Sequence, residues 1–125
     1  MKALLSIKPE YVERILSGEK TYEFRRKIFK RSDVDTIVIY ATRPQGAVVA
    51  EAPIVEVLEA EPQRIWERTH EHGGISKKSF MNYFRGSNCA YAIRLGKITQ
   101  FDQPIPLTDY SDRISRPPQS FVYVN

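Results

Sequence analysis

Two spacings of apolar residues recur along the chain and predict short strands mixed with short helices. Residues 3–7 form a brief apolar run, which is typical of a strand. In residues 9–17 the apolar side chains lie three and four positions apart, so they share one face of a helix, and Gly18 is expected to end it. Residues 20–27 alternate polar and apolar side chains, as the two-residue period of a strand requires. The chain is therefore expected to begin with strand, helix and strand.

The remaining pattern predicts further strands around a helical middle region. Strands are expected over residues 36–42, 47–58, 90–95 and 119–124, and helices over residues 62–71 and 76–85. Ser76 is expected to cap the second of these helices, and a proline-containing segment is expected to link the last two strands. Such an element list excludes a helical bundle and disfavours a doubly wound sheet. We predict an α+β fold, a small mixed β-barrel of about six strands flanked by two or three helices.

The apolar sides of the first elements predict one shared core. Its expected members are Val12, Ile15, Leu16, Tyr22, Phe24, Ile37 and Ile39. On the second strand, the side chains that alternate with Tyr22 and Phe24 are polar. Thr21, Glu23 and Arg25 are therefore expected on the opposite face.

Length and composition predict a single domain over residues 1–125. Hydrophobic residues make up 42% of the chain and charged residues 27%, which is enough apolar material for a core and excludes a disordered chain. No apolar run approaches the roughly 20 residues of a membrane-spanning helix, so no membrane partner is expected. The single Cys89 cannot form an internal disulfide, and the first residues lack a signal-peptide pattern. We therefore expect a reducing, cytoplasmic location.

Positive charge gathers toward the two ends of the chain, whose net charge is +4. Residues 1–31 contain nine Lys and Arg against four Glu, whereas residues 51–71 contain six Glu against two Arg. If the two ends meet in the fold, they form a basic face that attracts RNA or DNA, and this binding weakens as salt rises. An ordinary solvated surface accounts for the charge equally well.

Most sequence signatures of catalysis or cofactor binding are absent. The chain has no P-loop, no G-x-G-x-x-G, no H-E-x-x-H and no C-x-x-C, so no cofactor is expected. His70 and His72 are two residues apart, which on a helix points them to different sides, so we expect no metal site there. Cys89 lies beside an apolar strand, where an inert buried thiol is the expected state.

The densest polar chemistry lies in residues 18–26, together with Lys8 just upstream. The helix between them turns the chain back, so Lys8 and Lys20 are expected to approach each other. On the polar face of the following strand, Arg25 is expected to pair with Glu23 and orient it. The alternative is a solvent-exposed strand face with one weak ion pair.

These residues resemble the opening of the ASCH family, within the PUA-like superfamily. The resemblance rests on Ser6-Ile7-Lys8-Pro9 and on Ile15-Leu16-Ser17-Gly18-Glu19-Lys20-Thr21-Tyr22-Glu23-Phe24-Arg25. Weaker matches follow in the same order: Ile39-Tyr40-Ala41-Thr42, Tyr83-Phe84-Arg85-Gly86 and Pro118-Gln119-Ser120-Phe121. The G-x-K-T-x-E-x-R element is the most specific of these.

The resemblance implies a PUA-like β-barrel with a cleft between barrel and helices, in a family proposed to bind RNA. The residues that it places in the cleft are Lys8, Lys20, Glu23, Arg25, Tyr40, Gln119 and Ser120, and Thr21 joins them on the polar strand face. Lysine and arginine would hold phosphate, and Tyr40 would stack a base or belong to the core.

Two functions stay open on this evidence, and binding of RNA or a nucleotide without catalysis is the favoured one. The alternative is a hydrolase that uses Glu23 for proton transfer and Lys20 as its electrostatic partner, acting on RNA or on a modified nucleoside. Relatives that resemble acetylcytidine amidohydrolases have a threonine nucleophile three residues after the lysine that matches Lys20. This chain has Glu23 there, which disfavours that chemistry. DNA as a partner and the oligomeric state stay open.

Overall fold

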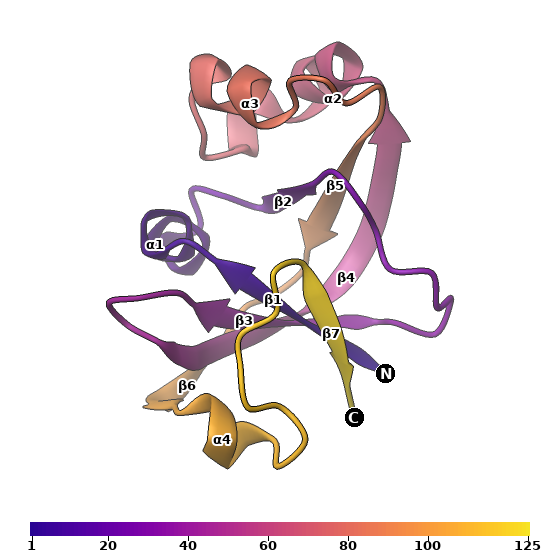
Figure 1. Ribbon diagram of the computed structural model, residues 1–125. Helices are drawn as coiled ribbons and strands as arrows, with labels where there is room; N and C mark the ends of the chain where they lie inside the picture. The colour runs from indigo at the N-terminus through magenta and orange to yellow at the C-terminus, as the bar shows by residue number, and fades with distance from the viewer.

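The computed structural model describes residues 1–125 and is built on one curved sheet of mixed strand direction (Figure 1). Its strands are β1 (Lys2–Ile7), β2 (Tyr22–Arg25), β3 (Thr36–Ala41), β4 (Ala47–Ala60), β5 (Ala90–Leu95), β6 (Thr99–Ile105) and β7 (Phe121–Val124). The spatial order is β2-β5-β4-β3-β1-β7, and β6 pairs with β4. Only β1 and β3 run parallel to each other. The sheet does not close, because β2 and β7 remain at its two ends. The α+β class and the mixed sheet expected from the sequence are confirmed, and the expected barrel is a half-barrel.

The long strand β4 joins the two halves of this sheet. Its first half pairs with β3 on one edge and with β6 on the other, and its second half pairs with β5. The pairing with β5 shifts register between Ile54 and Glu56, just after Pro53. A shift of this kind bends a strand and increases its twist. It allows one strand to serve both walls of the half-barrel.

Three helices of seven to nine residues lie against the sheet. They are α1 (Pro9–Ser17), α2 (Pro62–Thr69) and α3 (Lys77–Tyr83), and shorter turns form η1 (His70–His72) and α4 (Leu107–Tyr110). The bounds of α1 are those expected, with Pro9 in its first turn and Gly18 ending it at a φ of 87°. The side chain of Ser76 accepts a hydrogen bond from the backbone N–H of Ser79, so the expected cap is confirmed. None of these helices has the length and apolar character to cross a membrane.

The apolar residues form three buried clusters rather than the single core expected from the sequence. Val12, Ile15, Ile37 and Ile39 pack inside the half-barrel, with Leu16 partly buried against them. Tyr22 and Phe24 belong to another cluster, in which Phe24 packs against Phe80 of α3 with ring centroids 5.0 Å apart. The expected alternation of β2 is correct. The shared core is wrong, because β2 lies at the sheet edge and turns its apolar face to the helices.

A third cluster covers the outer face of β1 and β3 and explains their continuous apolar sequences. Leu4 and Val38 point away from the half-barrel and pack against Leu107 and Ile114. A strand that is buried on both faces does not alternate in polarity. The covering segment includes β6 and α4, two elements that the sequence pattern did not predict. The β6 sequence is polar and contains Pro104, which an edge strand tolerates.

The helical unit α2–α3 is attached to α1 and to the segment just before β2 through three consecutive backbone carbonyls. The carbonyl of His72 accepts from the backbone N–H of Thr21, that of Gly73 from Lys20 Nζ and that of Gly74 from Arg14 Nη1. Gly74 has a φ of +60°, and a Cβ atom there would lie 2.5 Å from Lys20 Cβ. The close approach of this loop to Lys20 therefore requires glycine at position 74.

We expect Gly74→Ala to lower the free energy of unfolding by more than Gly86→Ala does. Both glycines have positive φ, at +60° and +81°, but a Cβ at Gly86 has no neighbour within 4 Å. Gly86→Ala should therefore cost roughly 1 kcal/mol for the left-handed backbone alone, and Gly74→Ala should add the cost of displacing Lys20. Urea unfolding of both variants measures the difference, and equal losses would show that the loop can move away without cost.

Candidate functional site

A cavity of about 670 Å³ opens between the half-barrel and α3. This volume lies in the range of pockets that hold small ligands, roughly 300–1,000 Å³. Its walls come from five parts of the chain and contain Ser6, Ile7, Lys8, Glu10, Tyr11, Lys20, Glu23, Phe24, Arg25, Arg26, Ile75, Ser79, Asn82, Tyr83 and Gln119. Four of these side chains are cationic and two are anionic. The cavity is therefore suited to an anionic ligand.

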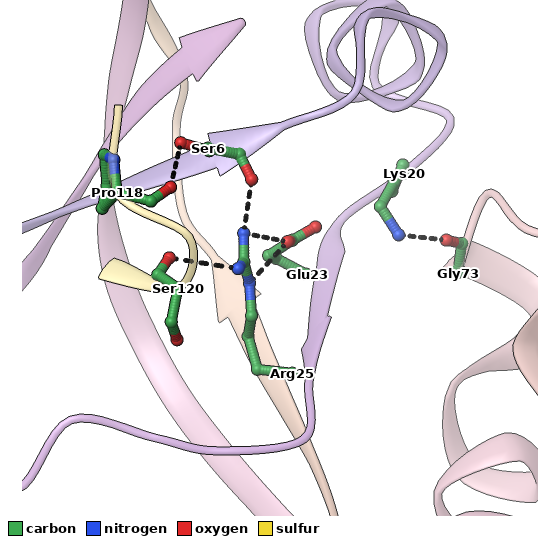
Figure 2. Close-up of polar contacts among 7 residues, drawn as sticks. All are labelled: Ser6, Lys20, Glu23, Arg25, Gly73, Pro118 and Ser120. Carbon is green, nitrogen blue, oxygen red and sulfur yellow. Dashed lines mark hydrogen bonds and ion pairs between the residues drawn. The ribbon is translucent and has the colours of Figure 1, made fainter. Parts of the chain in front are cut away.

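The carboxylate of Glu23 is held in the cavity wall by Arg25 (Figure 2). Its Oε2 atom accepts a hydrogen bond from Arg25 Nε at 2.9 Å and forms an ion pair with Arg25 Nη2 at the same distance. Only 9% of the Glu23 side chain and 12% of the Arg25 side chain is exposed. Both contacts go to the same oxygen, and Glu23 Oε1 has no protein donor. This oxygen is therefore available to a ligand.

The same guanidinium spans the gap between the open ends of the half-barrel, a place that we call the seam. Arg25 Nη2 donates to the carbonyl of Ser6 on β1 at 2.9 Å, and Arg25 Nη1 donates to the carbonyl of Ser120, just before β7, at 3.2 Å. The hydroxyl of Ser6 donates to the carbonyl of Pro118 at 2.8 Å. Figure 2 shows these contacts around one arginine. Arg25 thus supplies across the seam the hydrogen bonds that a further strand would make in a closed barrel.

Lys20 is the most deeply buried charged residue of the site, with 3% of its surface exposed. Its Nζ donates to the carbonyl of Gly73 at 2.7 Å and lies 4.5 Å from the ring centre of Phe24 and 5.4 Å from that of Tyr11. Burial lowers the pKa of Lys20 to about 8, and the nearby charge of Glu23 partly opposes this change. Lys20 therefore lies near the midpoint of its titration at mildly alkaline pH.

No group of three or more His, Cys, Asp or Glu side chains lies close enough together to hold a metal ion. His70 and His72 belong to η1, and His70 stacks on Trp66 with ring centroids 5.4 Å apart. Cys89 is partly buried, and its thiol lies 4.0 Å from the carbonyl of Ala90.

Comparison with known proteins identifies the family. The profile of the ASCH domain matches residues 5–99, which is most of the chain. The chain belongs to the ASCH family. It is 32% identical over 125 residues to an ASCH domain-containing ribonuclease of Zymomonas mobilis, and the match covers 98% of this chain and 84% of that protein. The crystal structure of ASCH from Zymomonas mobilis superposes with a TM-score of 0.89 and 31% identity, over 99% of this chain and 87% of that one.

A more distant structural match extends the fold likeness beyond the ASCH family. The N-terminal domain of McrB from Staphylothermus marinus superposes with a TM-score of 0.54 at 14% identity, over 91% of this chain and 81% of that one. At this identity the match concerns the fold alone.

The ASCH domain gathers five of the residues predicted from the sequence around its cavity. Lys8, Lys20, Glu23, Arg25 and Gln119 all line it. The side chain of Glu23 pairs with Arg25 as the strand pattern predicted, and the pair is buried rather than exposed.

Three predicted site residues lie outside the cavity lining. Tyr40 is 6% exposed and packs in the cluster on the outer face of β3. Thr21 contributes only its backbone, whose N–H bonds to the carbonyl of His72. Ser120 offers its carbonyl to Arg25 and lines a smaller neighbouring pocket.

The cavity also contains residues that the sequence analysis did not place in it. Ser6 is the one polar residue in the strand-like run of residues 3–7, and a polar residue in such a run is a local indication of a polar site. Arg26 directly follows the polar strand face, and its guanidinium lies 5.0 Å from the ring centre of Tyr83. Asn82 and Tyr83 come from α3, and nothing local in the sequence indicates that this helix faces the cavity.

We expect Arg25→Lys to lower the free energy of unfolding by roughly 2–4 kcal/mol, because lysine keeps the charge but cannot reach Glu23 and both carbonyls of the seam. Arg31→Lys is the matched control. Arg31 also pairs with a carboxylate two residues away, Asp33, but both side chains are about half exposed. Chemical denaturation should show little change in the free energy of unfolding for the control. A similarly small change for Arg25→Lys would mean that the stability of the seam does not depend on the guanidinium of Arg25.

The lowered pKa of Lys20 predicts a pH dependence of stability. The unfolded chain holds this proton up to the ordinary value of 10.5, whereas the folded protein releases it near 8. The contribution of Lys20 to stability should therefore rise between these two values, by up to about 3 kcal/mol, and be lost as pH falls through 8. The measurement is the free energy of unfolding of wild type minus that of Lys20→Met from pH 7 to 10.5. A difference that stays flat with pH would contradict the buried ammonium.

Proposed function

We propose that this ASCH domain binds single-stranded RNA in the cavity and cleaves it. The observation that carries the proposal is the carboxylate of Glu23, fixed by Arg25 with one oxygen left open, beside the buried ammonium of Lys20. The likeness to a ribonuclease along 98% of the chain supports cleavage over binding alone. Proton transfer and charge stabilisation are what phosphodiester cleavage asks of a protein.

The cationic residues would hold the RNA backbone. Lys8 and Arg26 lie at the cavity wall with Arg25 and Lys20, and Arg25 Nη1 makes only one hydrogen bond to the protein, to the carbonyl of Ser120. Lys20 uses one of its three donors on Gly73 and has two left for a phosphate. The phosphate contacts give affinity without base preference, so binding should fall steeply with salt.

The cleavage step would use Glu23 as its base. Glu23 Oε1 would accept the proton of the 2′-hydroxyl as that oxygen bonds to phosphorus, and the bond from phosphorus to the 5′ oxygen would break. The departing 5′ oxygen would take its proton from solvent, while Lys20 and Arg25 stabilise the charge that builds on the phosphate. Lys20 does this only when protonated. The kcat/KM of cleavage should therefore fall as pH rises through about 8, the pKa of Lys20 in the free protein.

The arrangement of Glu23 also supports this reading over amidohydrolysis. A threonine nucleophile would need the position that Glu23 occupies. The carboxylate of Glu23 contacts Arg25 through one oxygen only, so the other oxygen can receive a proton.

We expect Glu23→Gln to reduce RNA cleavage by roughly 10²- to 10⁴-fold while RNA affinity changes little, because the amide keeps the shape and the acceptor for Arg25 but cannot take up a proton. Glu56→Gln is the matched control. Glu56 pairs loosely with Arg94 at 3.8 Å on the exposed side of β4 and lies outside the cavity. The assay follows a labelled single-stranded oligoribonucleotide, with affinity measured separately at low salt.

Three outcomes of that assay separate the alternatives. Cleavage lost in Glu23→Gln and kept in Glu56→Gln supports the proposal. Salt-sensitive binding with no cleavage by the wild type would establish a binding domain without catalysis. No binding of single-stranded RNA at low salt would overturn both.

A further inference from the structure

The wall of the cavity formed by α3 has a chemistry that phosphate binding does not use. Ser79, Asn82 and Tyr83 are three and four residues apart, so they share one face of this helix, and all three line the cavity. The adjacent side of the helix, with Phe80 and Phe84, is buried against the sheet. The cavity-facing stripe thus presents a hydroxyl, an amide and an aromatic ring, and it carries no charge.

The position of Tyr83 suits a stacked base. The residue is 36% exposed, which is unusual for an aromatic residue of this chain. The guanidinium of Arg26 lies 5.0 Å from its centre, while Phe84 meets the ring edge-on at 4.8 Å. Aromatic rings and guanidinium planes are the surfaces on which proteins stack the bases of single-stranded RNA. Tyr83 and Arg26 provide such a surface in the cavity lining.

The amide of Asn82 is oriented by Arg85, since its oxygen accepts a hydrogen bond from Arg85 Nη2 at 2.9 Å. A guanidinium has donors only, so the atom that faces it must be Oδ1. The Nδ2 atom is then the part of the amide left for the cavity, and it can only donate. A donor at this place favours a carbonyl on the base over an amino group.

We propose that Asn82 makes the cavity select keto bases, uracil and guanine, over amino bases, cytosine and adenine, with the base stacked at Tyr83 and Arg26. This inference rests on the proposed function, since it names the RNA that the same cavity takes. The phosphate lies at Lys20 and Arg25, and the base lies against α3.

The test uses two probes of equal size, uridine 5′-monophosphate and cytidine 5′-monophosphate. They present a carbonyl and an amino group, respectively, at the same ring position. Wild type should bind the uridine probe about 3- to 10-fold more tightly, the range for one hydrogen bond made or lost. Asn82→Asp keeps the shape and the bond to Arg85 but presents an oxygen to the cavity, so it should reverse the preference. Titrations followed by nuclear magnetic resonance on the full chain measure both affinities.

Asn88→Asp controls for the added negative charge, because Asn88 lies beyond α3 and outside the cavity lining. This variant should keep the preference for the uridine probe. Equal affinity of wild type for both probes, or the same preference in Asn82→Asp as in Asn88→Asp, would overturn base selection by Asn82.

Oligoribonucleotides of uridine and of cytidine separate this failure from a failure of the proposed function. Binding and cleavage of both at equal rates would remove the base selection and leave the RNA function intact. Neither binding nor cleavage of either would overturn the RNA function and the base selection with it.

Discussion

The unclosed seam of the half-barrel is the constraint on which the rest of the structure depends. Where β2 fails to meet β1 and β7, the carbonyls of Ser6 and Ser120 have no strand to pair with, and Arg25 donates to both. A partly buried guanidinium needs a counter-charge, and Glu23 supplies it from the same strand. The arginine that satisfies these carbonyls therefore brings a carboxylate into the wall of the cavity. Fold and candidate chemistry share the same two side chains.

The helical unit is attached by the same kind of contact, in which side chains of the first elements donate to main-chain carbonyls. Lys20 and Arg14 each bond to a carbonyl of the glycine pair before α3, and Thr21 adds a backbone bond. These contacts set the distance between the half-barrel and α3, and that distance defines the cavity. Lys20 contributes both to the structure and to the site, since it holds the helical unit and lines the cavity. Substitution of Lys20 will therefore combine a structural effect with a functional one.

Local patterns predicted much of this architecture, and their failures have physical causes. Pro9 and Gly18 mark the ends of α1 because each acts on the backbone at its own position. The polar strand β6 was missed because a solvated edge strand with a proline carries no alternation to detect. The predicted role of Tyr40 rested on resemblance, and a strand buried on both faces does not reveal which side a given residue takes. Asn82 and Tyr83 became part of the site only through long-range packing of α3.

The environment of Lys20 allows its charge to change without loss of the fold. Its bond to the carbonyl of Gly73 needs only an N–H donor, and both the ammonium and the neutral amine provide one. With a pKa of about 8, the residue can release its proton while the loop before α3 stays attached. Glu23 opposes that release, and a bound phosphate would oppose it further, because each negative charge favours the ammonium. Ligand binding and protonation of Lys20 are therefore linked, so each strengthens the other while the surrounding contacts remain in place.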